Sequence, residues 1–196
     1  MANVIKLRKG LDVNLKGKAA KEEFQVKKPA VYALMPDDFT GMKPKVVVKE
    51  NNVVKVGDSL FVDKNHPEIK FVSPVSGRVT MVERGDRRKV LSVRVEADAE
   101  QQYVDFGKKN VGQMTAQEVK DLLLESGLFG FFRQRPYDVT ANPSDTPKAI
   151  FVSAFNSMPL AADFEYVLRG READFQAGLD ALAKMAKTYL GVSSKQ

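Results

Sequence analysis

The side chains that most often carry out chemistry in proteins are scarce in this sequence of 196 residues. His66 is the only histidine and cysteine is absent, which excludes a Ser-His-Asp triad, a multi-histidine metal site, an iron–sulfur cluster and a thiolate zinc site within it. Asp37 and Asp38 suggest a hard cation, but such an ion needs several converging oxygens, and two adjacent acids on a loop are usually solvated. No GxGxxG or GxxxxGK[ST] motif is present. We therefore predict no catalytic residue and no metal ligand, and we interpret His66, beside Pro67, as a turn residue.

Aromatic rings and guanidinium groups are concentrated in one short stretch. It holds Phe129, Phe131 and Phe132, followed by Arg133 and Arg135. Two interpretations remain open. The rings could pack as a hinge between two domains, or they could form a recognition surface for a planar redox ring or a partner subunit, through stacking and cation–π contacts. The two arginines are candidates for contact with an anion or a partner, and the sequence names no ligand for them.

The net charge of +6 is concentrated at the start of the chain, where residues 1–28 hold eight basic and three acidic side chains. Such a basic arm attracts nucleic acid, anionic lipid or an acidic partner. Phe24 is its only aromatic residue, so it offers no stacking ladder for single-stranded nucleic acid. A lysine-rich edge, with short strands over Val4–Leu7 and Leu11–Leu15, is an equally open interpretation. The sequence has no secretory signal and no apolar run near the roughly 18–20 residues that span a bilayer.

Residues 45–96 are expected to form short strands separated by tight turns. The predicted turns lie at Asn51, at Gly57, over residues 65–67 and over residues 74–77, where the chain has turn-forming residues. Strands this short, with apolar residues alternating along them, favour a small β-sandwich or barrel. The predicted strands are Val46–Val48, Ser59–Asp63, Arg78–Glu83 and Val90–Glu96.

The later part of the chain has the pattern of an α/β unit. Thr115 followed by Glu118 predicts a capping box, and Gly127 predicts the end of that helix. Residues 142–147 are expected to be a linker. The apolar run 149–155 then predicts a strand buried in a parallel sheet.

Two helices should follow that strand. One has Pro159 in its first turn, and the other has an apolar face running from Phe175 to Leu190. No returning strand is apparent after them. We therefore expect residues 148–196 to be the first strand and helices of an incomplete α/β domain, in a fragment whose partner sequence lies C-terminal.

The spacing VGDxL…VSPxSGxV in the β-rich region resembles the biotinyl/lipoyl carrier fold. Carriers present a lysine at a hairpin tip for the prosthetic group. The equivalent stretch here is DKNHPEIK, in which neither Lys64 nor Lys70 has the residues that flank the carrier lysine. The resemblance implies the fold of a carrier without its attachment site.

A more extensive resemblance is to the A subunit of the sodium-translocating NADH:quinone reductase, with the C subunit of the Rnf electron-transport complex as a related family. It is carried by four blocks in order. They are residues 5–12 (IKLRKGLD), residues 57–96 with the arginine-rich turn ERGDRR, residues 126–137 (SGLFGFFRQRPY) and residues 147–163 (PKAIFVSAFNSMPLAAD).

The resemblance implies a mixed α+β chain with three parts. Residues 1–98 would hold a lipoyl-like β-sandwich of the barrel-sandwich hybrid type, with its core in residues 45–96. Residues 99–147 would be a helix and linker, and residues 148–196 the start of a Rossmann-like α/β domain.

By the same resemblance, the chain would be a peripheral subunit segment on the cytoplasmic face of the bacterial inner membrane. The complex couples NADH oxidation and ubiquinone reduction to sodium export, with flavins and an iron–sulfur centre on other subunits. The segment itself would bind no cofactor and be inactive alone. Its partners would be other subunits, integral ones included, and ubiquinone is a further candidate, whereas nucleic acid is not expected. The alternatives are a biotin- or lipoyl-type carrier and a nucleic-acid-binding module that uses the basic arm.

Overall fold

The computed structural model describes residues 15–17, 20–156 and 158–192. The predicted strand Val4–Leu7 and nearly all of Leu11–Leu15 lie outside these residues. The strands are β1 (Val31–Leu34), β2 (Pro44–Val46), β3 (Val53–Val54), β4 (Ser59–Asp63), β5 (Lys70–Val72), β6 (Gly77–Arg84), β7 (Val90–Ala97), β8 (Arg133–Gln134), β9 (Val139–Thr140), β10 (Ile150–Ser153) and β11 (Thr188–Gly191). The helices are α1 (Ala116–Glu125), α2 (Phe164–Leu168) and α3 (Glu172–Met185).

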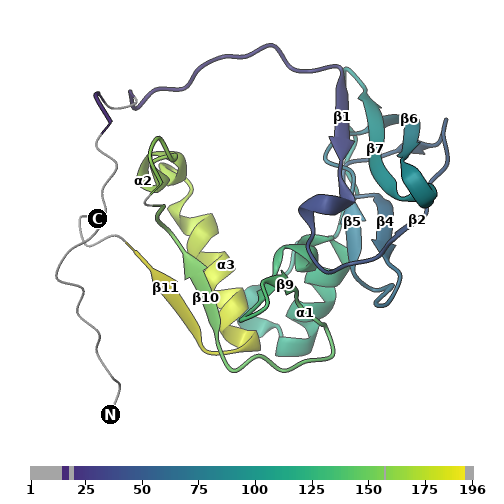
Figure 1. Ribbon diagram of the computed structural model, residues 1–196. Coiled ribbons are helices and arrows are strands. Elements are labelled where there is room, and N and C mark those ends of the chain that lie inside the picture. Colours follow the sequence, from purple (N-terminus) through teal and green to yellow (C-terminus); the bar gives the residue numbers. More distant parts are fainter. Residues whose placement is uncertain (1–14, 18–19, 157, 193–196) are drawn as a thin grey trace.

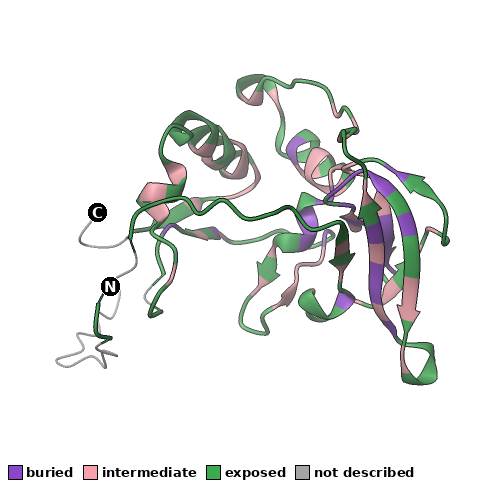
Figure 2. Ribbon diagram, turned by 90° about the horizontal axis from the view of Figure 1, so that it is seen from above, coloured by how far each residue is buried: buried purple, intermediate pink, exposed green. Residues whose placement is uncertain are grey.

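Residues 31–97 form a sandwich of two antiparallel sheets. One sheet has the strand order β1-β7-β6-β3 and the other the order β2-β4-β5. The side chains alternate between core and solvent over residues 77–80 of β6 and 93–96 of β7, which is the period of two expected for a half-buried strand, and β-bulges interrupt the alternation elsewhere. The predicted sandwich is confirmed, with β4 at its predicted bounds and β2 two residues earlier than expected. Figure 2 shows that burial is concentrated in this part of the molecule. The side chains that are almost fully buried here are Leu60, Phe61, Ile69, Phe71, Val79, Val93 and Val95.

The corners of the sandwich depend on residues that tolerate positive φ. Asn51 has φ 69° and Gly57 has φ 98°, as the sequence predicts for these turns. Gly77 is under the strongest constraint, because a β-carbon there would lie 1.8 Å from the backbone carbonyl oxygen of Glu96. Only glycine lets β6 approach β7 this closely.

The loop after β1, residues 35–43, contributes to the core. The Phe39 ring packs against Phe71 with 4.4 Å between ring centroids, and edge-on to Phe61 at 6.4 Å. The turn-forming residues around Phe39 predicted the loop correctly, but they do not indicate that its one ring turns inward over the β2-β4-β5 sheet.

Helix α1 begins and ends as predicted. Thr115 and Glu118 form both hydrogen bonds of the capping box, and Gly127 has φ 76° immediately after the last turn. α1 packs against α3, and the ammonium of Lys184 on α3 donates to the carbonyl oxygen of Gly112 at 3.1 Å. This helix pair joins the sandwich side of the molecule to the α/β unit, residues 148–192 (Figure 1).

The α/β unit differs from its prediction at three places. The first helix begins not at Pro159 but after Asp163, whose carboxylate caps the amide of Tyr166, and Leu160 before it has φ 59°. The second helix ends at Met185 rather than reaching Leu190. Residues 188–191 instead form β11, which pairs in parallel with β10. A returning strand is therefore present, contrary to expectation.

The strand β10 is not buried on both faces as predicted. Ile150 is buried, whereas its neighbour Phe151, on the opposite face, is 78% exposed. The reason is that, among the described residues, the sheet has two strands and is covered on one side. Figure 1 also shows residues 20–30 running as an extended segment between α2 and β1, held at the α2 end by a 2.6 Å ion pair between Lys21 and Asp163.

Candidate functional site

An open groove of about 1640 Å³ lies in the described structure, and we call it the aromatic groove. One wall is the predicted stretch from Phe129 to Arg135, and the other is formed by residues 147–153 together with Lys187 and Tyr189. The groove therefore brings the segment selected from the sequence next to the α/β unit. Sequence reasoning did not anticipate the second wall.

The three rings of the first wall divide between the two interpretations. Phe129 is buried and packs on Phe132 at 5.4 Å between ring centroids, which makes these two rings a packing hinge. Phe131 is 68% exposed and touches Phe39 edge-on at 5.6 Å. Phe131 is thus the ring of this group that remains free to contact a ligand or partner.

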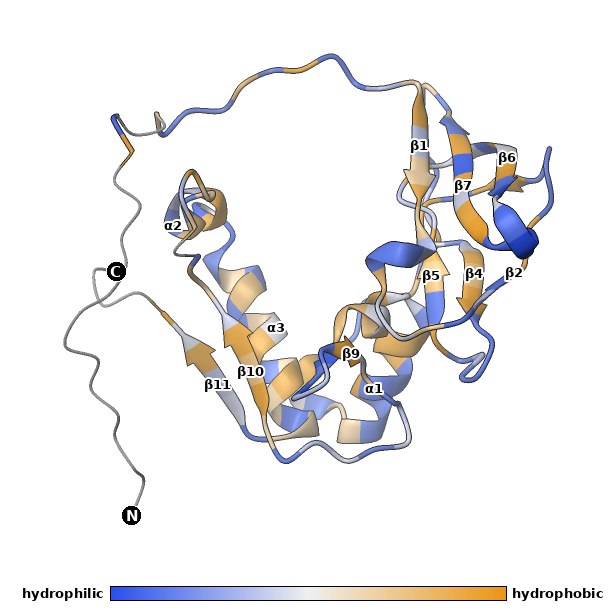
Figure 3. Ribbon diagram, in the orientation of Figure 1, coloured by the Kyte–Doolittle hydropathy of each residue, from blue (hydrophilic) through white to orange (hydrophobic). Residues whose placement is uncertain are grey.

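The second wall carries a stacked pair of rings. Phe151 and Tyr189 lie opposite each other in the β10–β11 register, with centroids 5.2 Å apart and planes at 12°. The Lys187 ammonium lies 5.0 Å from the centre of the Tyr189 ring, and the Tyr189 hydroxyl raises the pKa of Lys187. The wall therefore presents aromatic surface beside a cation that stays charged at neutral pH. Figure 3 shows β10 as largely hydrophobic, although the groove leaves it open to solvent.

The two arginines of the first wall differ in how firmly they are held. Arg133 donates to the backbone carbonyl oxygens of Asp138 at 3.1 Å and Asp38 at 3.3 Å, so it fastens the β8–β9 hairpin to the loop after β1. Arg135 makes a loose 3.5 Å ion pair with Asp138, and its side chain is 76% exposed. Of the two predicted contact residues, Arg135 makes no hydrogen bond to the backbone within the described structure and is the freer of the two to contact a partner.

The remaining candidate residues lie away from this groove. Asp37 is paired with Lys89 at 2.6 Å, and among the described residues no three His, Asp or Glu side chains converge as a metal site would require. His66 is a turn residue as predicted, since its carbonyl oxygen accepts from the amide of Ile69 at 2.9 Å. Lys64 is exposed in the turn after β4, whereas Lys70 lies within strand β5 opposite Val62 rather than at a hairpin tip.

The groove has the surface of a binding site, but the described residues that line it include no nucleophile beside a general base. It combines exposed rings, apolar side chains and a few cations. Such a surface suits a planar ring or the apolar face of another polypeptide. No helix in the described part of the chain is both long enough and apolar enough to cross a bilayer.

The architecture is that of a barrel-sandwich hybrid joined to an α/β unit, and comparison with known proteins gives the same division. Residues 5–98 match the family model of the NqrA N-terminal barrel-sandwich hybrid domain, and residues 114–196 match that of the NqrA second alpha/beta domain. The chain belongs to the NqrA family.

Curated relatives agree with this assignment. The chain is 34% identical over 190 residues to the A subunit of the Na(+)-translocating NADH-quinone reductase of Pseudomonas aeruginosa strain UCBPP-PA14, covering 95% of this chain and 42% of the relative. It is 37% identical over 186 residues to the protein of the same name from Serratia proteamaculans strain 568, covering 93% and 41%. The chain therefore spans about two fifths of the length of these relatives.

Proposed function

We propose that this chain acts as a docking segment of a multi-subunit, sodium-translocating NADH–quinone reductase, peripheral to the membrane on its cytoplasmic side. The observation that carries the proposal is the open aromatic wall of the α/β unit, in a chain whose relatives are named as one of the subunits of that enzyme. A large ring such as Phe151 left in water is costly unless another surface covers it. Within the complex, a further polypeptide of the reductase covers the Phe151–Tyr189 pair.

The proposed role is structural rather than redox. The described residues offer binding surfaces, and NADH, flavins, the iron–sulfur centre and the quinone chemistry belong to the rest of the complex. The chain contributes to the enzyme by holding its neighbours in place, and by itself it transfers no electrons. Assayed alone, it should therefore not oxidise NADH.

Co-purification tests the docking role. A tag on the chain should recover multi-pass, flavin-bearing subunits from native membranes solubilised in mild detergent. The double variant Phe151→Ala/Tyr189→Ala should lose most of that recovery, because it removes the stacked rings of the wall. Tyr103→Ala, which removes a ring that is 68% exposed on the sandwich, is the matched control and should recover the subunits normally. Recovery of no such subunits by the unaltered chain would overturn the proposal.

Contact with ubiquinone is a second candidate for the same groove. It is favoured by the pairing of flat exposed rings with the charged Lys187, which together could hold a quinone ring and an oxygen on it. A short-chain quinone carrying a photoreactive group should then label Phe151 or Tyr189. Labelling that is spread over the sandwich, or that excess unlabelled quinone does not compete away, would count against this role.

The carrier alternative is tested separately. Lys64 is the only one of the two candidate lysines that lies in a turn. Chain produced together with a biotin or lipoate ligase should keep its unmodified mass, whereas a gain of one prosthetic group on Lys64 would support a carrier.

A further inference from the structure

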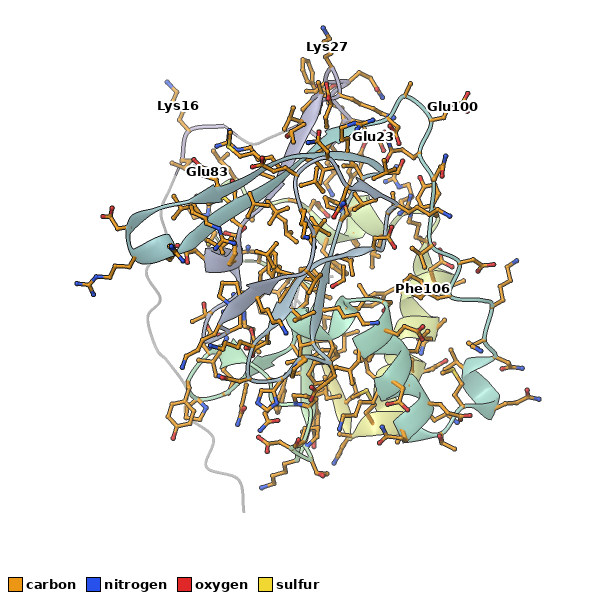
Figure 4. All side chains as sticks on the ribbon, turned by 90° about the vertical axis from the view of Figure 1, so that its right-hand side faces the viewer. Lys16, Glu23, Lys27, Glu83, Glu100 and Phe106 are labelled. Atoms are coloured by element: carbon orange, nitrogen blue, oxygen red, sulfur yellow. The ribbon has the colours of Figure 1, made fainter. Side chains whose placement is uncertain are left out.

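The end of the β6–β7 hairpin is a strongly basic surface that the docking role does not use. We call residues 84–89, with the sequence RGDRRK, the basic hairpin tip. Residues 84 and 86–89 are all exposed, and burial resumes only at Val90. Figure 3 shows the tip as one of the most hydrophilic parts of the molecule, and Figure 4 shows its side chains pointing away from the rest of the chain on the side of the labelled Glu83.

The backbone of the tip does not account for its sequence. Arg87 has φ 53° and Arg88 has φ 61°, so two successive residues with a β-carbon adopt the left-handed conformation. Hairpin turns with this conformation strongly prefer Asn-Gly or Asp-Gly. The chain instead places two arginines there, which makes sense if the charge at this position is what matters.

Neighbouring acids neutralise only part of the charge. Lys89 is paired with Asp37 at 2.6 Å, and Arg94 is paired with Glu83 at 2.7 Å. Asp86 lies in the tip itself. The Arg84 guanidinium donates only to the backbone carbonyl of Arg88, at 3.3 Å. In the described chain, the guanidinium groups of Arg87 and Arg88 have neither an acidic nor a carbonyl partner. The tip therefore presents donors that are ready for an external anion.

We propose that the basic hairpin tip binds the phosphate groups of anionic phospholipid headgroups. A guanidinium offers two parallel donors that match two phosphate oxygens, which a lysine ammonium does not. A projecting tip reaches a broad charged surface without needing a complementary cavity. The proposal rests on the proposed function only in that it assumes a chain working beside a membrane.

An acidic protein partner fits the tip less well. Protein interfaces are enriched in aromatic residues, Met and Arg, and they depend on a few anchors that are buried among apolar contacts in well-packed, desolvated pockets. Residues 83–89 contain no apolar side chain, so the tip offers no anchor of this kind. A surface made only of charges is instead what attraction to a lipid headgroup layer requires.

Vesicle flotation with the purified chain tests the proposal. The chain should bind vesicles of phosphatidylcholine containing phosphatidylglycerol, and not vesicles of phosphatidylcholine alone. Binding should decrease strongly when the salt is raised from about 50 mM to about 500 mM, because screening shortens the reach of surface charges. Equal binding to both kinds of vesicle, or binding that salt does not weaken, would overturn the proposal.

The decisive variant removes charge from the basic hairpin tip without destabilising its turn. Arg87→Asn/Arg88→Gly installs the residues that this turn prefers, so the chain should keep or gain thermal stability. Its affinity for the anionic vesicles should nevertheless fall roughly 25-fold, about fivefold per arginine. The control Lys55→Ala/Lys64→Ala removes the same charge from exposed positions elsewhere on the sandwich and should bind nearly as well as the parent chain. If both double variants lose the same affinity, only the net charge matters and the tip has no special role.

Two further experiments identify the source of the anion. Inorganic phosphate added at constant ionic strength should leave vesicle binding unchanged, and displacement by it would mean a site for small anions rather than for lipid. If the tip variant loses capture of an acidic polypeptide while the parent chain fails to float with any vesicle, the partner is a protein and the proposal is wrong. Co-purification with reductase subunits measures the docking role independently, so either result can fail without the other.

Discussion

The α/β unit is at least as rich in apolar residues as the sandwich, but it buries far fewer of them. Of the buried apolar side chains in the described chain, eleven lie in residues 31–97 and two, Ile150 and Ala154, in residues 148–192. Helix α3 has no buried residue at all within the described structure. The sandwich therefore carries its own core, whereas the α/β unit has large rings and aliphatic side chains in contact with water.

The difference follows from the number of layers. Two sheets packed face to face bury the inner side of each, so a region of modest length can be stable alone. Two parallel strands with one neighbouring helix leave a sheet face open, and parallel sheets are normally covered on both faces. The sandwich thus buries a core of its own, and the α/β unit is the part whose stability should depend on what packs against it.

The largest expected effect comes from a matched pair of phenylalanines. Phe61→Ala should lower the free energy of unfolding by about 3–5 kcal/mol, because it leaves a cavity in the centre of the sandwich. Phe151→Ala removes the same side chain from an open face and should change the free energy of unfolding by less than about 0.5 kcal/mol. Urea unfolding followed by circular dichroism measures both. A Phe151 variant as damaging as the Phe61 variant would show that the α/β unit has a core of its own.

Hydrogen exchange should separate the two regions in the unaltered chain. Amides in β6 and β7 should exchange only on global unfolding. Those in β10 and β11 should exchange through local openings whose free energy is lower than that of global unfolding by about 2 kcal/mol or more. Residue-resolved exchange under native conditions provides the measurement. Equal protection in the two sheets would contradict this comparison and would also remove the reason to expect a covering partner.

A smaller effect is expected at the helix between the two regions. Thr115→Ala removes the side chain that caps the amide of Glu118 and should cost about 1 kcal/mol. Gln117→Ala, two residues further along on the exposed surface, is the control and should be nearly neutral. If α1 couples the sandwich to the α/β unit, the Thr115 variant should also speed the hydrogen exchange of amides in α3. An effect confined to α1 would show that the two regions are independent.

The smallest expected effect is on the pH dependence of the sandwich. The Ser92 hydroxyl and then the Arg94 guanidinium, both bonded to the carboxylate, lower the pKa of Glu83 below its usual value of 4.5. A carboxyl with a lowered pKa in the folded state stabilises the fold above about pH 4.5, and this contribution is lost as the pH falls through the folded-state value. Because the Glu83 side chain is still about one third exposed to solvent, the change should be slight.

The measurement is the urea midpoint between pH 7 and pH 3. Glu83→Gln should have a flatter profile than the parent chain over the acidic part of this range, and Glu100→Gln, at an exposed position without an ion pair in the described structure, should keep the parent profile. Profiles that coincide for Glu83→Gln and the parent chain would show that the Ser92 and Arg94 contacts do not hold in solution.

Local signals in the sequence predicted the fold wherever a short motif decides the structure. Thr115 with Glu118 fixes the start of α1, Gly127 its end, and the turns at Asn51 and Gly57 the corners of the sandwich. The errors occur where competing signals overlap. Leu190 continues the spacing of the helical face, but the preceding Thr188 and Tyr189 favour a strand, and pairing with β10 decides the outcome.

Of the two walls of the aromatic groove, one was predictable from the sequence. The Phe129–Arg135 wall is contiguous in the sequence, so its composition alone identified it. The opposite wall depends on Phe151 and Tyr189 becoming neighbours through the register of two distant strands. No local pattern contains that information. The same limit explains Phe39, whose inward direction depends on Phe71 in another strand.

The pairing of β1 with β7 sets the order in which a growing chain completes its parts. Val31–Leu34 has no strand partner until Val93–Glu96 has been made, about 60 residues later, which is several seconds at ordinary rates of translation. Once that happens, the first sheet closes while all three helices are still to be synthesised. Each later segment is therefore made after the strands of the sandwich, and the two strands of the α/β unit are the last to be paired.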